Sequence, residues 1–324
     1  MSTVDSWSTI RLHHLRDLLA VVETGSLRAA ARKLGLTQPS LTKSLRQLEE
    51  QTALALLVRS KHGVTLTSAG QHLVERARLI ESELRRTAED LDLLRGGTVR
   101  SVSVGVSMAT PLDFIARAVA ALHQQDPGLS VQIFEGVQAK MIADVRQGVV
   151  DFAIMPVTQR EPLLDLRARP LFHTRVVVVG RAGHPCASAR SLAELTGCHW
   201  ITPHRRGVLD GMVERLATGM QLPPFNRPIQ CDSSPMYWDL IAHTDLLGLS
   251  LATKLDDNSV AGAQIIYDGP PLREVSVSLV HRTDFPQNVI AGELARRCRE
   301  EAAIYAHRRA GSIETSVNHD ITKA

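Results

Sequence analysis

The sequence predicts a multidomain α+β protein, in which a small helical domain with a β-hairpin is joined by one long helix to a larger α/β domain. Three observations support this prediction. Helical periodicity dominates residues 11–52, one amphipathic helix is indicated over 67–97, and strand-like and helix-like segments alternate from residue 98 onwards. Because 324 residues are too many for one compact core, two or three domains are expected.

The composition is that of a globular protein, with 44% hydrophobic and 22% charged residues. No apolar run approaches the ~20 residues that a membrane span needs. The N-terminus lacks a basic segment followed by an apolar one, so we expect neither a membrane span nor a signal peptide. The cysteines at positions 186, 198, 231 and 298 lack C-x-x-C spacing, which favours reduced thiols in a cytoplasmic protein.

Positive charge is concentrated at the N-terminal end. Residues 1–66 hold nine basic and five acidic side chains, an excess of four positive charges, whereas the net charge of the whole chain is only +3. The first fifth of the chain is basic, whereas the rest of the chain is nearly neutral. This distribution of charge indicates that one end of the molecule binds a polyanion. A solvated charged surface would show the same imbalance, so charge alone does not decide this point.

Residues 12–52 have the spacing of three short helices. Apolar residues recur at i, i+3, i+4 and i+7 in the first helix, which Gly25 ends. Ser26 is expected to cap the second helix and Thr37 the third, whose first turn tolerates Pro39. Leucines at 41, 45 and 48 of the third helix face inward, so its polar and basic side chains face out. This arrangement is typical of a helix-turn-helix, whose third helix enters a major groove.

The outward side chains of this domain suit a nucleic acid. Glutamine and arginine can form bidentate bonds with base edges, and serine, threonine and lysine can hold phosphates or bases. The segment "LVRSKHGVTL" at 57–66 predicts a hairpin wing with a basic tip that clamps phosphates. The predicted contacts with DNA are Ser26, Arg28, Thr37, Gln38, Pro39, Ser40, Thr42, Lys43, Arg46, Arg59 and Lys61.

The long helix over residues 67–97 has a heptad pattern. Its apolar stripe recurs at alternating spacings of four and three residues, which is typical of a helix that packs along a partner helix. The simplest partner is a second copy of the chain, and packing within one chain is the alternative. The predicted dimerisation residues are Leu73, Ala77, Ile80, Leu84 and Leu91.

Residues 98–308 predict two similar α/β lobes joined by two crossovers. Lobe I is expected to comprise residues 98–172 and 273–308, and lobe II residues 173–272. A helix is expected at 207–220 within lobe II, and the C-terminal helix is expected to return to lobe I. Residues 309–324 carry no periodicity and predict a disordered tail.

A small-molecule site is expected where the two lobes face each other. Ligands of open α/β sheets bind beyond the carboxyl ends of the strands, and helix starts there favour an anion. The sulfur and hydroxyl side chains of these loops suit an aromatic acid or sulfonate, although the arginines could equally be solvated. The candidate residues are Ser107, Met108, Thr110, Gly136, Val137, Thr202, His204, Arg205, Ser233, Ser234 and Met236.

The segment "VVETGSLRAAARKLGLTQPSLTKSLRQLEEQTALALLVRSKHGVTLTSAG" resembles the signature of the LysR-type transcriptional regulators, and the resemblance extends over residues 11–306. The later motifs "VDFAI", "VVVVGRAGHP" and "AHTDLL" look most like the branch of the toluenesulfonate regulator and the galactose-binding-protein regulator. Ala53 and Leu57 depart from the glycine and phenylalanine usual in the family, and Thr42 stands where serine is commoner.

The resemblance implies a winged helix-turn-helix, a dimerisation linker helix and a two-lobed periplasmic-binding-protein-like (type 2) effector domain. It also implies a cytoplasmic homodimer or homotetramer. The implied partners are double-stranded promoter DNA and a small-molecule effector, with RNA polymerase as a further candidate. No catalytic residue, cofactor or metal is expected.

Three alternatives stay open at this level. "GVSMA" resembles part of a nucleophile elbow, so Ser107 could serve a hydrolase with Asp239 and His281. His13, His14, His184 and Cys186 could take part in a metal site, although they lack further ligands at a useful spacing. Cysteines 186, 198 or 231 could make the protein a redox-responsive regulator of the same fold.

Overall fold

The computed structural model describes residues 10–60, 63–95, 101–157, 163, 165–202, 226–255, 260–270, 272, 274–283 and 289–321. The chain forms two compact units. One comprises Met1–Val99 with Gln147–Val149, and the other comprises Arg100–Arg146 with Val150–Ala324.

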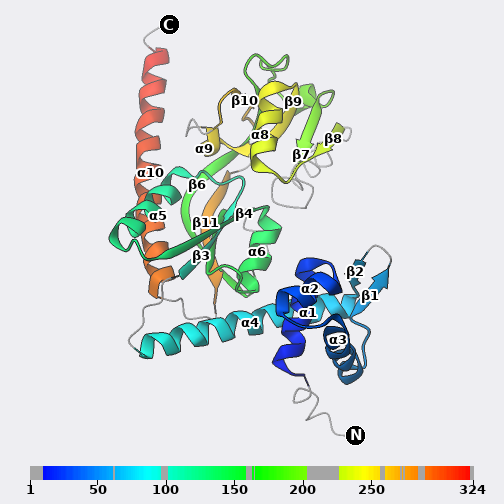
Figure 1. Cartoon of the computed structure of the whole chain (residues 1–324). Coiled ribbons are helices and arrows are strands. Elements are labelled where there is room, and N and C mark those ends of the chain that lie inside the picture. The colour runs from blue at the N-terminus through cyan, green and yellow to red at the C-terminus, as the bar shows by residue number, and fades with distance from the viewer. Residues whose placement is uncertain are drawn as a thin grey trace. The chain divides into compact units, whose positions relative to one another are not determined.

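The described part of the first unit contains helices α1 to α4 and a two-stranded hairpin (Figure 1). Their bounds are α1 Leu12–Thr24, α2 Leu27–Leu34, α3 Gln38–Thr52, β1 Leu57–Ser60, β2 Gly63–Leu66 and α4 Ser68–Leu94. Gly25 and Gly35 adopt the left-handed conformation that ends α1 and α2. Thr37 caps α3 by accepting a hydrogen bond from the Ser40 amide at 3.3 Å, whereas the Ser26 side chain makes no capping bond to α2.

An apolar cluster holds these helices together. Leu41, Leu45 and Leu48 of α3 are buried, as their helical spacing predicts, and they belong to the same cluster as Leu18 of α1. Burial of each such side chain contributes about 1.5–3 kcal/mol. Two buried alanines of α2, at positions 30 and 31, join the cluster and allow the helices to approach closely.

The turn after α3 holds a non-glycine residue in the left-handed conformation. Ala53 has φ 53° and ψ 28°, and its amide bonds back to the Glu49 and Glu50 carbonyls. An L-residue in this conformation costs roughly 1–2 kcal/mol. The Glu49 carboxylate holds the chain beyond the turn by accepting the amides of Leu56 and Leu57 at 2.8 and 3.2 Å. Ala53 therefore strains the turn after α3, while the hydrogen bonds to Glu49 stabilise the chain that leads into the hairpin.

Ala53→Gly is expected to raise the free energy of unfolding by about 0.5–1 kcal/mol, because the relief of left-handed strain exceeds the extra backbone entropy that glycine loses. Urea unfolding followed by circular dichroism measures this change. Ala55→Gly is the matched control, since residue 55 has no positive φ to relieve and should lose stability. A lower stability for Ala53→Gly would contradict the assignment of strain.

The start of α4 lies against the hairpin. Thr67 caps α4 by accepting a hydrogen bond from the Gly70 amide at 3.0 Å, and its hydroxyl donates to the Ala55 carbonyl at 2.7 Å. The Thr67 amide donates to the Leu56 carbonyl at 3.0 Å. A Cβ atom at residue 70 would lie only 2.1 Å from that same carbonyl oxygen, so this approach requires glycine.

The second unit alternates strands and helices, as the sequence predicts. The described elements are β3 Ser101–Ser107, α5 Asp113–Gln125, β4 Ser130–Gly136, α6 Gln138–Arg146, β5 Phe152–Val157, β6 Leu166–Arg181, the 3-10 helix η2 Leu192–Leu195, β7 His199–Thr202, β8 Asn226–Gln230, α8 Ser234–His243, β9 Leu246–Leu251, α9 Ala252–Leu255, β10 Ala263–Tyr267, β11 Glu274–Arg282 and α10 Val289–Ile321.

Within the described residues, one mixed sheet runs through this unit in the order β4-β3-β5-β11-β6-β9-β7-β8, with β10 paired to β6. β3 is parallel to β4 and β5, and β7 is parallel to β8 and β9. The two long strands β6 and β11 are antiparallel to each other and to their other neighbours, β9 and β5. These two strands form the crossovers between the lobes.

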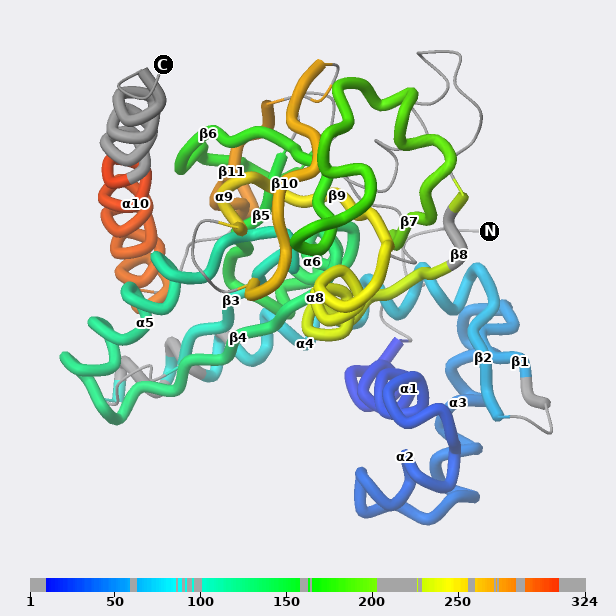
Figure 2. The backbone as a smooth tube through the Cα atoms, turned by 90° about the horizontal axis from the view of Figure 1, so that it is seen from above, coloured from blue at the N-terminus to red at the C-terminus, as the bar shows by residue number. Residues whose placement is uncertain are grey.

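The C-terminal helix packs on lobe I, as predicted. α10 lies beside α5 in both views (Figures 1 and 2). Phe114 of α5, Phe172 of β6 and Tyr305 of α10 form an aromatic cluster with ring centroids 5.4–5.8 Å apart. The Tyr305 hydroxyl also donates to the Thr253 carbonyl at 2.9 Å, so α10 bonds to α9 as well.

Several elements differ from the prediction. The segment from Pro111 has helical periodicity, but α5 begins only at Asp113, and the strand β10 was not predicted from the sequence. The predicted helix at 207–220 lies outside the described residues. α10 continues to Ile321, so residues 309–321 belong to this helix, whereas the sequence predicts a disordered tail from residue 309. An established helix gains one hydrogen bond for each residue added, and this segment contains no proline to end it.

Candidate functional site

The outward face of α3 carries polar and basic side chains above the buried leucines. Gln38, Ser40, Lys43 and Arg46 are exposed and Thr42 is half-buried, as the helical spacing predicts. An open hollow on this face is lined by Gln38, Pro39, Thr42, Lys43 and Arg46. The side chains predicted to meet DNA from α3 therefore share one accessible surface, which offers amide, hydroxyl, ammonium and guanidinium donors.

Arg46 already has a partner in this surface. Its Nε lies 2.8 Å from the Glu50 carboxylate, one helical turn away, and both side chains are largely exposed. An exposed ion pair of this kind contributes less than about 1 kcal/mol. Arg46 can therefore leave Glu50 for a base edge at little cost.

A buried polar contact ties α3 to α1. The Ser44 hydroxyl donates to the Asp17 carboxylate at 2.6 Å, and the Arg16 guanidinium lies 3.1 Å from the other carboxylate oxygen. Asp17 and Ser44 are both buried. Because a buried carboxylate must keep its hydrogen bonds, this contact restrains how α3 sits on α1. The contact between Asp17 and Ser44 was not predicted from the sequence. The sequence signal for it was an aspartate on the buried face of α1.

The other predicted DNA contacts surround α3. Arg28 is exposed near the start of α2, and Ser26 is half-buried. Arg59 lies in β1, which pairs antiparallel with β2, and Ser60 pairs with Gly63 across the tip of the hairpin. Lys61 lies outside the described residues.

In the second unit, the loop after β3 is built differently from the prediction. Ser107 is buried at the end of β3, and its hydroxyl accepts a hydrogen bond from the Ala109 amide at 3.4 Å. Thr110 is also buried and donates to the Ile154 carbonyl at 3.3 Å. The predicted placement of both hydroxyls at a helix start is wrong, since α5 begins only at Asp113. Both hydroxyls therefore stabilise the loop after β3 by hydrogen bonds within the protein.

Nevertheless, the loops after β3, β4, β7 and β8 lie together. The Met108 amide donates to the Gly136 carbonyl at 3.1 Å, and the Met108 side chain packs on the apolar cluster of lobe II that contains Ile201 and Tyr237. The Cys231 amide donates to the Thr202 carbonyl at 2.9 Å. Val137, directly after β4, is buried. These contacts join strand ends from both lobes at one place.

Thr202 has an unusual hydroxyl. The residue is only 2% exposed, and among the described residues its buried Oγ1 atom has no hydrogen-bond partner. Buried hydroxyls are normally hydrogen-bonded, because an unsatisfied one costs about 1–3 kcal/mol. His204 and Arg205, which follow Thr202, lie outside the described residues.

The start of α8 is accessible. Ser233 occupies the cap position with an exposed side chain that makes no capping bond, and Ser234 is half-buried as the first helical residue. Met236 is 53% exposed in the first turn. The start of α8 therefore carries exposed side chains and no side-chain cap.

Lys254 is a buried charged residue beside these loops that was not predicted from the sequence. It belongs to α9, directly after β9, and is only 3% exposed. Its ammonium donates to the Thr110 carbonyl at 3.0 Å, next to the loop after β3. A buried ammonium is costly unless hydrogen bonds or anions surround it. The available signal was a lysine directly behind an apolar strand.

The apolar stripe of α4 divides into two parts. Leu73 and Ala77 belong to the apolar cluster of their own domain, and Ala77 is only 1% exposed. Ala77 is therefore covered by its own domain and not free for a partner, whereas Leu73 is only half-buried. Ile80, Leu84 and Leu91 are 40%, 48% and 49% exposed.

The geometry argues against the hydrolase alternative. A hydrolase nucleophile must be accessible at the strand end, whereas Ser107 is buried. His281 directs Nδ1 to the Arg282 carbonyl at 2.8 Å, and Asp239 is exposed on α8. Over the described residues, no group of three potential ligands is placed to hold a metal ion. None of the described helices has the length and apolar character to cross a membrane.

Comparison with known families decides the identity of both units. Residues 95–303 match the LysR substrate binding domain, and residues 12–71 match the bacterial regulatory helix-turn-helix protein, lysR family. The chain belongs to the LysR family. This LysR-type protein is therefore a DNA-binding transcriptional regulator with an effector-binding domain, and not an enzyme.

Similar regulators and structures agree with this assignment. The regulator TdcA of Escherichia coli (strain K12) is 29% identical over 245 residues, which cover 74% of this chain and 78% of TdcA. GbpR of Azospirillum brasilense is 28% identical over 239 residues, which cover 73% of this chain and 70% of GbpR. The LysR-family regulator CbnR shares the fold with a TM-score of 0.59 at 18% identity, over 90% of this chain and 99% of CbnR. A full-length OxyR variant from Pseudomonas aeruginosa has a TM-score of 0.58 at 20% identity, over 90% and 95% of the chains.

Proposed function

We propose that the effector of this LysR-type regulator is a small anion, an aromatic acid or a sulfonate, bound at the joined strand ends of the two lobes. The observation that carries this proposal is a pair of buried polar groups beside those loops. The Lys254 ammonium supplies positive charge, and the Thr202 hydroxyl has no partner within the described structure. An anion with hydrogen-bonding oxygens would give the Thr202 hydroxyl a partner and would be attracted by the positive charge of Lys254.

The surrounding groups favour an anion with an apolar body. The open amides at the start of α8 stabilise negative charge through the helix dipole. Met108 and Met236 supply apolar surface from opposite lobes. His204 and Arg205 are proposed to add cationic donors from the loop after Thr202.

A thermal-shift screen of the full-length protein tests this proposal. Benzoates, benzenesulfonates and sugars are compared at matched concentrations, because a ligand that binds the folded state raises the melting temperature by mass action. A dose-dependent rise with the anions supports the proposal. If only the sugars raise the melting temperature, the proposal is wrong. That result would favour the resemblance to the galactose-binding-protein regulator over the resemblance to the toluenesulfonate regulator.

Thr202→Val is expected to separate ligand binding from stability. Valine keeps the shape but removes the unpaired hydroxyl, so the ligand-free protein should gain about 1 kcal/mol, while effector affinity falls about tenfold. Calorimetric titration and urea unfolding measure the two effects. Thr253→Val is the matched control, because the Thr253 hydroxyl accepts a hydrogen bond from Thr174 at 3.3 Å and its loss should lower stability. Unchanged effector affinity in Thr202→Val would remove this hydroxyl from the site.

We infer that α3 reads base edges of the promoter and that the hairpin holds phosphates. The grounds are the shared exposed surface on α3 and the weak pairing of Arg46 with Glu50. The helix-turn-helix family match over residues 12–71 supports this proposal. Ser26, Arg28, Arg59 and Lys61 are proposed as flanking phosphate contacts.

Arg46→Ala is expected to lower affinity for a cognate promoter fragment by about 1–3 kcal/mol if the guanidinium reads a base. Affinity for a scrambled fragment should fall much less, as fluorescence anisotropy at fixed salt can show. Arg32→Ala is the control, since it removes the same charge from an exposed position on α2. Undiminished promoter binding by a double Gln38→Ala, Arg46→Ala variant would contradict the assignment of α3.

We also propose that α4 pairs with a second copy of the chain. Ile80, Leu84 and Leu91 form an exposed apolar stripe beyond the part of α4 that its own domain covers. A dimer would present two α3 helices to two half-sites of DNA. Association of two such dimers would give the tetramer.

A further inference from the structure

Two cysteines of lobe II lie in direct contact. The Sγ atoms of Cys186 and Cys198 are 3.0 Å apart, although twelve residues separate them in the sequence. A disulfide bond brings two sulfurs to about 2.05 Å, so these atoms need to move together by only ~1 Å. Both side chains are half-buried against the large core cluster, so the pair retains access to solvent.

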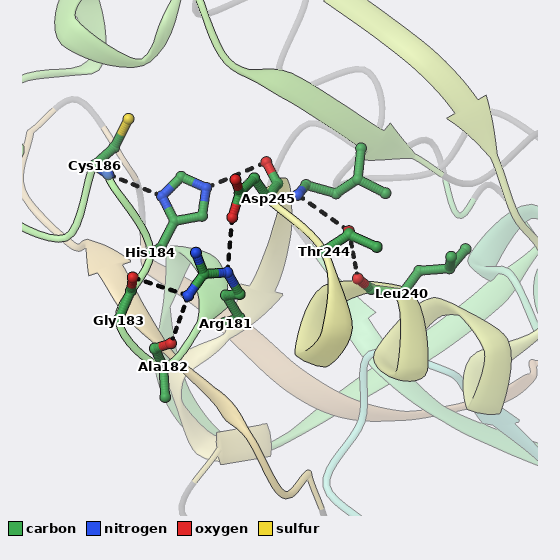
Figure 3. Close-up of polar contacts among 9 residues, drawn as sticks. Arg181, Ala182, Gly183, His184, Cys186, Leu240, Thr244 and Asp245 are labelled. Carbon is green, nitrogen blue, oxygen red and sulfur yellow. Dashed lines mark hydrogen bonds and ion pairs between the residues drawn. The ribbon is translucent and has the colours of Figure 1, made fainter.

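The backbone around both cysteines is held in place. The Cys186 amide donates to Nδ1 of His184 at 3.0 Å, which leaves the proton on Nε2 to donate to the Asp245 carbonyl at 3.2 Å (Figure 3). Arg181 pairs with the Asp245 carboxylate at 2.7 Å. On the other side, the Cys198 amide donates to the Leu195 carbonyl at 3.2 Å at the end of η2. The contact between the sulfurs is therefore fixed by local hydrogen bonds from both sides.

The remaining cysteines are placed differently. Cys298 is fully buried in α10, and burial raises the pKa of its thiol to about 12. Cys231 donates its thiol to the Ser233 carbonyl at 3.4 Å. Burial, together with the hydrogen bond between Cys198 and Cys186, raises the pKa of Cys198 to about 12, so this thiol stays protonated at neutral pH. Cys198 therefore suits the second step of a thiol–disulfide exchange.

We propose that Cys186 and Cys198 are a redox-active pair that forms a reversible disulfide with a disulfide oxidant such as oxidised glutathione. The Cys186 sulfur attacks one glutathione sulfur and releases the first glutathione thiol. The Cys198 sulfur then attacks the mixed disulfide at Cys186 and releases the second. In total the two protein thiols lose two protons and two electrons, which reduce one oxidised glutathione to two thiols.

The disulfide would close the segment from Cys186 to Cys198, which leads directly into β7 and its last residue, Thr202. A cross-link restrains this segment in the unfolded chain, so oxidation is expected to raise the melting temperature by several degrees. The modification site itself does not depend on the proposed effector, because it follows from the contact between the two sulfurs alone.

Peptide mapping of the wild-type protein tests the proposal directly. The dilute full-length protein is equilibrated with reduced and oxidised glutathione at several ratios, its free thiols are alkylated, and it is digested with trypsin. Cleavage after Arg181, Arg190 and Arg205 places the two cysteines on separate peptides, 182–190 and 191–205. A disulfide joins these peptides into one species whose mass is their sum less two hydrogen atoms. We expect this species to accumulate as oxidised glutathione increases and to disappear with dithiothreitol.

Variants provide the matched controls. Cys231→Ser should leave both the linked peptide and its dependence on the glutathione ratio unchanged, whereas Cys186→Ser and Cys198→Ser should each abolish it. The wild-type mapping needs no variant, so a folding defect in either serine variant does not affect the test. Cys186 and Cys198 found alkylated in the most oxidising buffer would overturn the proposal. So would linkage of either residue to Cys231, or a melting temperature that falls on oxidation.

Discussion

Gly70→Ala is expected to destabilise the N-terminal domain by about 3 kcal/mol or more, at the upper end of the range for overpacking. The added Cβ would lie 2.1 Å from the Leu56 carbonyl oxygen and 3.0 Å from a methyl carbon of Leu66. The oxygen belongs to the backbone and already accepts the Thr67 amide, so it cannot move away as a flexible side chain could. Relief requires α4 to separate from the hairpin, which would also break the Thr67 cap.

Differential scanning calorimetry of the full-length protein can measure this loss. The transition of the N-terminal domain should move to a lower temperature, while that of the effector domain should stay in place. Gly197→Ala is the control, because a Cβ there meets nothing within 4 Å and residue 197 has no left-handed φ. A variant of Gly70 that melts like the wild type would show that α4 can leave the hairpin at little cost.

Leu84→Glu is expected to weaken self-association by at least ~3 kcal/mol, since it buries a charge in the proposed apolar seam. Leu84 is 48% exposed within the single chain, so the change leaves the domain core intact. This separation makes the test specific for association, whereas a charge at Ala77 would also disrupt the domain. Sedimentation velocity at micromolar concentration should show a shift from dimer or tetramer to monomer.

Gln71→Glu is the matched control for this prediction. It adds the same negative charge at an exposed position on the face of α4 opposite the stripe. Its sedimentation should match that of the wild type. If Leu84→Glu and Gln71→Glu sediment alike, the copies associate through another surface.

The N-terminal domain could be predicted almost entirely from the sequence, because its signals are local. Helical spacing predicted the burial of Leu41, Leu45 and Leu48, and glycines predicted the ends of α1 and α2. The exposure of the polar face of α3 followed from the same spacing. The contact between Asp17 and Ser44 did not, since it joins residues 27 positions apart on different helices.

In the effector domain, local sequence patterns predicted the elements but not the surroundings of individual side chains. The alternation of strands and helices predicted two lobes and two crossovers, and the rule for strand ends selected loops that lie close together in the structure. The state of individual side chains depended on neighbours far along the chain. Ser107 and Thr110 looked like free hydroxyls at a helix start, but both are buried, and Thr110 bonds to Ile154 on another strand.

The sequence alone therefore predicted the family, the order of the domains and the helix that we propose to read DNA, because these predictions follow from periodicity, capping residues and a long motif. Only the tertiary structure placed the Lys254 ammonium beside Thr110, 144 residues away, and the Cys186 sulfur 3.0 Å from that of Cys198. It also showed that Ala77 belongs to its own domain core, while Leu84 remains exposed on the same stripe. Periodicity tells which residues share a face, but packing decides what covers that face.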